Sequence, residues 1–406
     1  MVGKINLSVI MYGGLSYGGA HRQMIRLLCA LDKTKYRIVY FWCVPKPDLN
    51  STFVWPELDY SNIKLLESNG IEVVEFTSNG RDVAKKYHPW IDTNFFEIFK
   101  KYKTDLIFSS RAGYPEYPFV KLREPIVEWN VFGCVDNSSN LVYSVHSSDW
   151  TFNAWSRQNP NCRGEVIYPP VPNPVGIESF KEELKIGLED IVLGFHQRDD
   201  DHIYGEQAMR AYAILRPEVA RNAKFVVLGG SEKYKMLASK LGINVHFLPI
   251  AKDYRDVSKF LNTLDIFTHT GGAGETLAIT VQEAMIHGLP VVTMRLEDVP
   301  NGQIETLHGA GLVVNTIEEY SMAICELIQN DKKRSDLGSF AKQIAIDNYN
   351  YKIAVDKFDR VFNEISKKYI NVKFRKSITV CLNEFFGDNE LWLSLLNILR
   401  RIKNAI

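Results

Sequence analysis

The first part of the chain alternates short apolar runs with longer stretches in which apolar residues recur at helical spacing. The apolar runs predict strands at 4–11, 36–44, 73–76, 106–109, 126–129, 141–145 and 165–167. The helical spacing predicts helices at 20–31 and 149–156. Such alternation predicts a parallel sheet that is covered by helices on both faces.

A proline-rich segment at 168–175 separates this set from a second one. Its four prolines cannot belong to a helix or a central strand, so the segment is expected to link two domains. Beyond it, strands are predicted at 191–195, 225–228, 245–248, 265–269, 291–294 and 311–314, and helices at 206–215, 233–241, 257–262 and 281–287. The predicted fold class is α/β, with two doubly wound Rossmann-like domains, at 1–172 and 173–350, that face each other across a cleft.

Length and charge narrow the function classes. A chain of 406 residues is too long for a single hydrophobic core and suits two domains. The 48 basic and 48 acidic residues cancel, which gives no indication of a nucleic-acid partner. Six cysteines without paired spacing are typical of reduced thiols in a cytosolic protein, and no apolar run reaches the roughly 18 residues of a membrane span. We therefore expect a soluble, cytoplasmic protein.

The segment 271–292 carries the clearest chemistry. It contains a glycine-rich loop, a predicted helix that ends at Gly288 and Pro290, and a following strand. A strand, a glycine loop and a helix N-terminus form an anion site, because unpaired N–H groups and the helix dipole point the same way. Two carboxylates, Glu275 in the loop and Glu283 near the helix start, flank this site. A ligand with both phosphates and hydroxyls, such as a nucleotide sugar, would use all of these groups.

This segment resembles the Glu-x7-Glu signature of glycosyltransferase family 4. Glu275, seven residues, Glu283 and the exit Gly–Leu–Pro–Val–Val at 288–292 match that pattern. The resemblance implies the two-domain GT-B fold and sugar transfer with retention at the anomeric carbon. It also implies that a last helix, at 351–369 within C-terminal helices at 351–406, recrosses to the first domain.

The resemblance implies a role for each part of the segment. Glu275 would hold hydroxyls of the donor sugar close to the reacting carbon, as a positioning group and not as a nucleophile. Glu283 would accept the ribose hydroxyls. Ala278, where the family usually has Gly, is expected to be tolerated if its φ is negative. Backbone N–H groups at the helix start would bind the β-phosphate, and the substrate-binding residues here are Thr276, Leu277, Ala278, Ile279 and Thr280.

A second glycine-rich turn follows the first predicted strand. Residues 12–21 lack GxGxxG spacing, so a dinucleotide cofactor is not expected. The turn resembles the Gly-Gly-Ala loop of family 4, in which Gly18 and Gly19 would face the donor phosphates or the acceptor. His21 stands where that family often has an acidic residue. A tight turn without a ligand is the alternative.

The segment after the first strand of the second domain departs from the family pattern. Arg198 would neutralise the departing diphosphate, with a surface ion pair as the alternative. The expected Lys is absent, and the acidic run 199–201 stands about where it should be. That run contains an Asp-x-Asp, which elsewhere holds Mg²⁺ or Mn²⁺. We expect a solvated turn here and no essential metal.

Two loops of the first domain are expected to reach the cleft. Asn130 stands near where family 4 often has a His that contacts the donor sugar, and its amide can still bond a hydroxyl. Arg111 and Glu128 are further candidates. Arg111 as a structural ion pair and Asn130 as a turn residue are the alternatives. His146 is favoured as a core histidine.

The sequence thus predicts a retaining glycosyltransferase that moves a hexose from a nucleotide-diphosphate sugar to a glycan or other hydroxyl acceptor. GDP-mannose is the preferred donor hypothesis, from its frequency in the family, and no cofactor is expected. A nucleotide-sugar epimerase shares the architecture and is one alternative. A non-catalytic sugar-binding GT-B subunit is another, favoured by the missing Lys and by Asn130.

The tail contains an amphipathic stretch at 391–403 with basic residues at its C-terminal end. We favour a helix packed on the first domain, with its basic residues complementing its own dipole. Weak contact with a membrane surface, or with a second copy in a homodimer, is the alternative.

Overall fold

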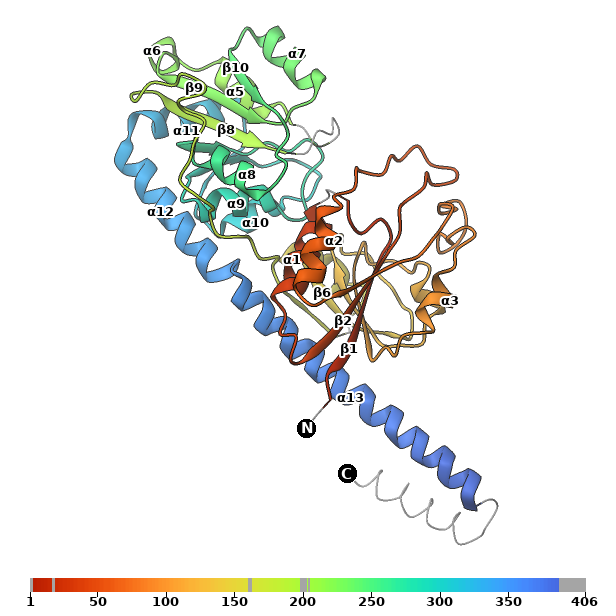
Figure 1. The fold of residues 1–406 in the computed structure, drawn as a ribbon. Coiled ribbons are helices and arrows are strands. Elements are labelled where there is room, and N and C mark those ends of the chain that lie inside the picture. Colours follow the sequence, from red (N-terminus) through yellow and green to blue (C-terminus); the bar gives the residue numbers. More distant parts are fainter. Residues whose placement is uncertain (1–2, 17–18, 160–162, 198–202, 204, 387–406) are drawn as a thin grey trace.

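The computed structural model describes residues 3–16, 19–159, 163–197, 203 and 205–386, which form two lobes (Figure 1). Each lobe is built around one sheet of parallel strands. The predicted pair of doubly wound, Rossmann-like α/β units is therefore confirmed. The amphipathic stretch at 391–403 lies outside the described residues, so its predicted contacts remain predictions.

The N-terminal lobe contains a seven-stranded sheet in the order β3-β2-β1-β4-β5-β6-β7. Its inner strands are mostly buried, as expected for a parallel sheet with helices on both faces, whereas the edge strands β3 and β7 are partly exposed. The strands are β1 (Ile5–Met11), β2 (Tyr36–Trp42), β3 (Glu72–Glu75), β4 (Leu106–Arg111), β5 (Ile126–Asn130), β6 (Leu141–His146) and β7 (Gly164–Val166). The helices are α1 (Gly19–Ala30), α2 (Ser61–Ser68), α3 (Phe95–Phe99), the 3-10 turn η1 (Phe119–Lys121) and α4 (Asp149–Ser156).

The C-terminal lobe contains a six-stranded sheet in the order β10-β9-β8-β11-β12-β13. Gly194 in β8 has no room for a side chain, since a Cβ there would lie 2.1 Å from the Val226 carbonyl oxygen. The strands are β8 (Ile191–His196), β9 (Ala223–Leu228), β10 (Val245–Leu248), β11 (Ile266–Thr268), β12 (Val291–Met294) and β13 (Leu312–Val314). The helices are α5 (Gln207–Ala213), α6 (Pro217–Ala220), α7 (Glu232–Leu241), α8 (Tyr254–Leu261), α9 (Ile279–Ile286), α10 (Gly302–Leu307), α11 (Ile317–Gln329) and α12 (Asp331–Asn348).

The long helix α13 (Tyr351–Phe386) runs from the C-terminal lobe along the N-terminal one (Figure 1). Phe358 and Phe362 of α13 pack on Phe108 of β4, with ring centroids 5.2 and 5.0 Å away. Phe358, Val361, Phe362 and Ile365 belong to the N-terminal core. The last described helix therefore belongs to the core of the N-terminal lobe, although it follows the C-terminal lobe in the sequence.

Two contacts join the lobes near the crossing. The Glu305 carboxylate of α10 accepts hydrogen bonds from the N–H groups of Asp149 (2.6 Å) and Trp150 (3.0 Å) at the start of α4. The Arg26 guanidinium of α1 lies 5.1 Å above the ring of Tyr254 in α8. A carboxylate at a helix N-terminus meets free N–H donors and the positive end of the dipole. Glu305 is thus a clasp between the lobes.

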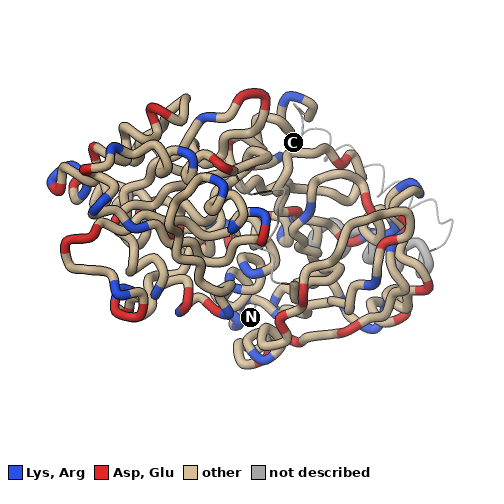
Figure 2. The backbone as a smooth tube through the Cα atoms, turned by 90° about the horizontal axis from the view of Figure 1, so that it is seen from above, with Lys and Arg blue, Asp and Glu red and all other residues tan. Residues whose placement is uncertain are grey.

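Basic and acidic positions are interspersed along both lobes (Figure 2). This matches the zero net charge of the chain. Among the helices of the described part of the chain, none combines the length and hydropathy that crossing a bilayer needs.

Candidate functional site

The loops expected to bind the donor lie where the direction of strand order reverses in the C-terminal sheet. That reversal falls between β8 and β11, and ligands of doubly wound sheets bind at such a point, beyond the carboxyl ends of the strands. The loop after β11 carries Glu275. The loop after β8 includes Arg198 and the acidic run 199–201, which lie outside the described residues.

Two glutamine side chains hydrogen-bond the β11–α9 loop. Gln197 donates to the Thr270 carbonyl oxygen (2.7 Å), and Gln207 donates to that of Gly271 (3.2 Å). The Thr270 hydroxyl in turn donates to the Gln207 side chain (2.6 Å). Gly274 has a φ of +76°, a conformation that favours glycine. The loop is therefore fixed in shape before any ligand binds.

Glu275 is anchored at both its backbone and its carboxylate. Its N–H donates to the Pro300 carbonyl (2.9 Å), and the Gly302 N–H donates to its own carbonyl (2.7 Å). Its Oε1 lies 3.1 Å from His269 Nε2, and His269 Nδ1 lies 2.9 Å from the Thr293 hydroxyl. A carboxylate can only accept, so His269 carries its proton on Nε2 and orients Glu275. The Glu275 side chain remains about one-fifth exposed and can reach a ligand.

His269 was not predicted as a site residue. The available signal was its place at the carboxyl end of a buried strand, six positions before Glu275. Its partnership with Glu275 needs the loop to fold back, which local sequence does not indicate.

Helix α9 begins at the loop exit. Ala278 is its N-cap, with φ −103° and ψ 85°, so the condition under which Ala is expected to be tolerated at this position is met. Ile279 and Thr280 are the first helical residues and are half-buried, as are Thr276 and Leu277 before them. The first N–H groups of a helix have no acceptor within it and are free for an anion. No side chain caps this end.

Glu283 lies in the second turn of α9, because the helix begins two residues earlier than expected. Its carboxylate is mostly buried, and its Oε2 lies 3.2 Å from Nε2 of His196 at the end of β8. Tyr254 lies close enough for the Glu283 charge to raise the pKa of its phenol, in addition to the larger effect of burial. Glu283 therefore lies deeper than Glu275.

The N-terminal glycine turn approaches this helix across the cleft. A Cβ placed on Gly19 would lie 3.4 Å from Cδ1 of Ile279. Gly18 lies outside the described residues. His21, two positions on, is paired through Nδ1 with the Ser16 hydroxyl, and burial lowers the pKa of His21 to about 4. The structure therefore brings Gly19 to the helix start that the sequence assigns to the phosphates.

Arg111 and Asn130 take part in a network inside the N-terminal lobe. Arg111 Nη2 donates to Glu128 (2.7 Å) and Asp136 (2.8 Å), and all three side chains are buried. Burial alone lowers the pKa of Arg111, but the charges around it outweigh burial and raise that pKa. Asn130 accepts from the Gly133 N–H (2.7 Å) and donates to a carbonyl of its own loop. Both side chains have the contacts expected of the structural alternatives, and their contact with a ligand remains a prediction.

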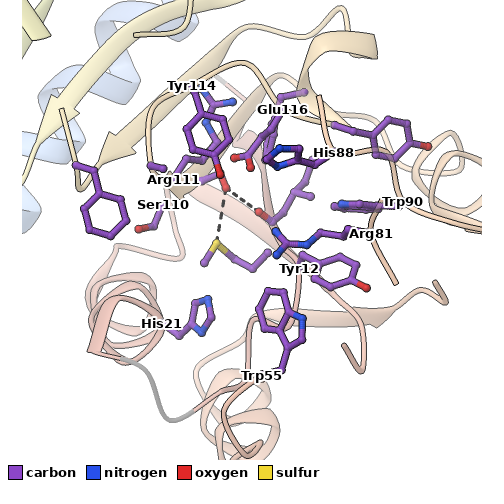
Figure 3. Close-up of a pocket in the computed structure, with 17 residues that line it drawn as sticks. Tyr12, His21, Trp55, Arg81, His88, Trp90, Ser110, Arg111, Tyr114 and Glu116 are labelled. Atoms are coloured by element: carbon purple, nitrogen blue, oxygen red, sulfur yellow. Dashed lines mark hydrogen bonds between the residues drawn. The ribbon is translucent and has the colours of Figure 1, made fainter. Parts of the chain in front are cut away.

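A cavity of about 280 Å³ opens beside this network (Figure 3). It lies beyond the carboxyl ends of β1 and β4, where the strand order of the N-terminal sheet reverses. Tyr12, His21, Trp55, Arg81, Arg111 and Glu116 are among the residues that line it. The cavity therefore lies at the reversal point of its sheet, as the β11–α9 loop does in the C-terminal sheet.

Residues 176–344 match the family described as glycosyl transferases group 1. That stretch is the C-terminal lobe, with the loop of Glu275 and helix α9. The match confirms the predicted resemblance at this level, while family 4 within the group remains a prediction.

Further likenesses come from the comparisons with individual proteins. The chain is 25% identical over 163 residues to an uncharacterized glycosyltransferase of Methanocaldococcus jannaschii, covering 39% of this chain and 42% of that protein. The chain thus matches less than half the length of this curated relative. Anabaena HepE in complex with UDP and glucose superposes with a TM-score of 0.65 at 16% identity, covering 89% of this chain and all of that one. Sucrose-phosphate synthase from Thermosynechococcus elongatus superposes with a TM-score of 0.67 at 13% identity, covering 89% of this chain and 99% of that one. These likenesses confirm the GT-B fold.

Among the residues that the structure describes, no group of three or more His, Cys, Asp or Glu side chains is placed to hold a metal ion. The Asp-x-Asp in 199–201 lies outside them, so its expected role as a solvated turn remains a prediction.

Proposed function

We propose that the chain is a retaining glycosyltransferase that moves a hexose from a nucleotide-diphosphate sugar to a hydroxyl of a glycan or other acceptor. One observation carries the proposal: Glu275, oriented by His269, stands at the loop that leads into the N-terminus of α9. Sugar hydroxyls and phosphate oxygens of one donor would then be bound by neighbouring groups. Gly19 approaches the same helix start from the other lobe.

The proposed chemistry is charge stabilisation as the nucleoside diphosphate leaves. Negative charge builds on the β-phosphate, and preorganised donors aimed at that charge lower the barrier. The N–H groups of Ala278, Ile279 and Thr280 would supply such donors, and Arg198 would supply a cation. Glu275 would position the hexose near the developing positive charge of its ring. The leaving phosphate would assist deprotonation of the acceptor on the same face, as the family resemblance implies.

The donor base and sugar are a finer part of the proposal. GDP-mannose is preferred from its frequency in family 4. The structural likeness to HepE, which has been crystallised with UDP-glucose, makes UDP-glucose the second donor to test.

A non-catalytic sugar-binding subunit is the second candidate, favoured by the absence of the expected Lys near Arg198. An epimerase would instead convert the nucleotide sugar without any acceptor. Product analysis with and without an acceptor separates it from a transferase.

The test combines donor binding with turnover. Calorimetric titration with GDP-mannose, UDP-glucose and UDP-N-acetylglucosamine, in EDTA and then in Mg²⁺, is expected to show metal-independent binding of one donor. With that donor and a panel of methyl hexosides, nucleoside diphosphate release is expected to fall roughly 10²-fold in Glu275→Gln, the scale of a lost transition-state contact. Glu318→Gln, which changes an exposed carboxylate in α11, is the matched control.

Each contrary result has a definite meaning. Donor binding without turnover in the unmodified protein would support the non-catalytic subunit. Binding only with Mg²⁺ would count against the proposed mechanism and favour a metal at 199–201. Full activity of Glu275→Gln would refute the role given to Glu275.

A further inference from the structure

Helix α10 connects the loop of Glu275 in the C-terminal lobe to α4 of the N-terminal lobe. It lies at the side of the C-terminal lobe that faces the other lobe (Figure 1). We propose that Glu305 of α10 is a positioning residue for sugar transfer: its bond to α4 holds α10 in place, and α10 in turn holds Glu275 beside the reacting hexose. This inference rests on the proposed transferase function. It adds a residue that acts through Glu275 and does not itself contact the substrate.

The N-terminal end of α10 is attached to the backbone of Glu275. The Gly302 N–H donates to the Glu275 carbonyl (2.7 Å), and the Glu275 N–H donates to the Pro300 carbonyl (2.9 Å). Glu275 and Asn301 thus form a short parallel bridge between the donor loop and the residues that precede α10. A Cβ on Gly302 would lie 2.5 Å from the Thr276 carbonyl carbon, so the two backbones are in direct contact. A displacement of α10 would therefore displace Glu275 as well.

The turn before α10 is held together by its own side chains. The Asn301 side chain accepts from the Leu296 N–H (2.9 Å) and donates to the carbonyl oxygens of Leu296 (2.8 Å) and Val299 (2.9 Å). The Gln303 amide donates to the same Asn301 oxygen (3.0 Å). Asn side chains that bond to nearby backbone groups fix the shape of a turn. We therefore expect the segment 296–303 to move together with α10 as one piece.

Glu305, one turn further along α10, makes the contact with the N-terminal lobe. Its carboxylate accepts from the N–H groups of Asp149 (2.6 Å) and Trp150 (3.0 Å), the first two residues of α4. The capping box of α4 uses the N–H groups of Ser148 and Thr151 and leaves these two for Glu305. Hydrogen bonds to a charged acceptor are stronger than neutral ones. The N-terminal lobe thus holds α10 through Glu305.

The C-terminal end of α10 is tied to the places where the chain passes between the lobes. The Tyr349 hydroxyl donates to the Thr306 carbonyl (2.7 Å), and the Val171 N–H donates to the Tyr349 carbonyl (2.8 Å). Tyr349 lies between α12 and α13, and Val171 belongs to the proline-rich segment between β7 and β8. Helix α10 therefore links the donor loop to α4 and to both connections, and a change in the angle between the lobes would reach Glu275 through it.

A small displacement of Glu275 is expected to affect the chemical step more than donor binding. Misplacing a positioning group by about 1 Å can cost roughly 10²-fold in rate. Donor affinity would come mainly from Glu283 and from the N–H groups at the start of α9, which belong to another helix. Loss of the bond between Glu305 and α4 should therefore lower kcat and leave the Kd of the donor unchanged.

Nucleoside diphosphate release tests this with and without an acceptor. Without an acceptor, water takes the place of the acceptor hydroxyl, and free hexose and nucleoside diphosphate leave the site. Both this slow release and kcat with saturating methyl hexoside are expected to fall about tenfold in Glu305→Ala, while the calorimetric Kd of the donor stays unchanged. The unchanged Kd also shows that the C-terminal lobe of the variant is folded. Glu305→Gln keeps an acceptor oxygen for α4 and is expected to lose less, about threefold.

Two comparisons separate positioning of Glu275 from a general loosening of the lobes. Glu305→Ala in the Glu275→Gln background is expected to lose less than about twofold more, because the residue through which Glu305 acts is already changed. Arg26→Gln is the matched control, since it weakens the other described contact between the lobes, that of α1 with Tyr254 of α8. It is expected to leave the release without an acceptor unchanged.

Three results would overturn the inference. They are an unchanged kcat in Glu305→Ala, a loss on Glu305→Ala that is as large in the Glu275→Gln background as in the unmodified protein, and equal losses of acceptor-independent release in Glu305→Ala and Arg26→Gln. Failure of the proposed function would look different, because the unmodified protein would then bind no donor or release no nucleoside diphosphate.

Discussion

Replacing Glu128 by Gln tests whether the buried charge network supports the N-terminal lobe. Glu128 is fully buried and accepts from Arg111 Nη2 (2.7 Å), the Ser144 hydroxyl (2.6 Å) and the Asn130 amide (3.3 Å). Gln keeps the shape, and its carbonyl oxygen can still accept from Ser144 and Asn130. Its NH2 group would then face Arg111 Nη2, so the variant removes the charge and the acceptor of that hydrogen bond together. Arg111 would then be left with Asp136 as its one carboxylate partner.

The expected cost follows from the burial of all three charges. Breaking a buried ion pair by removing one partner costs about 3–5 kcal/mol, because the remaining charge is poorly compensated. Since Asp136 still neutralises Arg111, we expect the lower end, about 3 kcal/mol, in the free energy of unfolding of the lobe. A urea slope of roughly 1–3 kcal/mol per molar converts this to a midpoint lowered by at least about 1 M.

Urea unfolding followed by tryptophan emission measures this directly, since residues 173–350 contain no tryptophan. Restricting the signal to one lobe also avoids treating a two-lobed chain as a single two-state unit. Glu97→Gln is the matched control, because Glu97 and its partner Lys101 are both exposed, and it should leave the midpoint unchanged. A loss below about 1 kcal/mol in Glu128→Gln, at an unchanged slope, would refute the reasoning.

Three further predictions concern other parts of the fold. Burial lowers the pKa of His146, and of His21, to about 4, so the folded state resists their protonation. The free energy of unfolding is therefore at its full value above pH 6.5 and falls by about 1.4 kcal/mol per pH unit for each histidine between pH 6.5 and 4. His146→Asn should reduce this slope by about 1.4 kcal/mol per pH unit, and an unchanged slope in pH-dependent urea titrations would contradict this. Glu305→Ala removes the hydrogen bonds to the start of α4 and should increase the radius of gyration measured by small-angle scattering. Glu305→Gln keeps an acceptor and should change the radius of gyration less. Equal scattering curves for the two variants and the unmodified protein would count against a clasp. Gly194→Ala places a methyl group 2.1 Å from the Val226 carbonyl oxygen. It should lower the free energy of unfolding, measured by calorimetry, by roughly 1–3 kcal/mol. A stability equal to that of the unmodified protein would show that the sheet adjusts freely.

The strand pattern of both lobes was readable from the sequence. The predicted strands at 245–248 and 291–294 coincide with β10 and β12, and the others agree with the structure to within a few residues. Buried parallel strands are continuous apolar runs bounded by turn residues, so each carries its signal locally. The glycine loop and helix start at 271–280 were recognisable for the same reason.

Several helices escaped prediction. In the C-terminal lobe these include α11 and α12, which were not anticipated at all. Helix α12 is largely polar, and only Gly338, Ala341 and Ala345 are buried along it. Such small residues do not form a clear stripe of apolar side chains along the sequence. Most of the stability of such a helix comes from packing against its neighbours. The short helices α2, α3, α6 and α10 likewise lack a long periodic pattern.

The sequence by itself determined the two parallel α/β units and the loop that leads into α9, because these depend on residues adjacent in the chain. Only the tertiary structure decided that Arg111 meets Glu128 and Asp136, since that contact requires β4 and β5 to pair in one register. The same holds for His269 against Glu275, and for the cavity between Trp55 and Glu116, whose loops have no regular pattern of their own. Strand propensity and turns are short-range properties, whereas burial, charge pairing and cavity shape arise only when distant segments exclude water together.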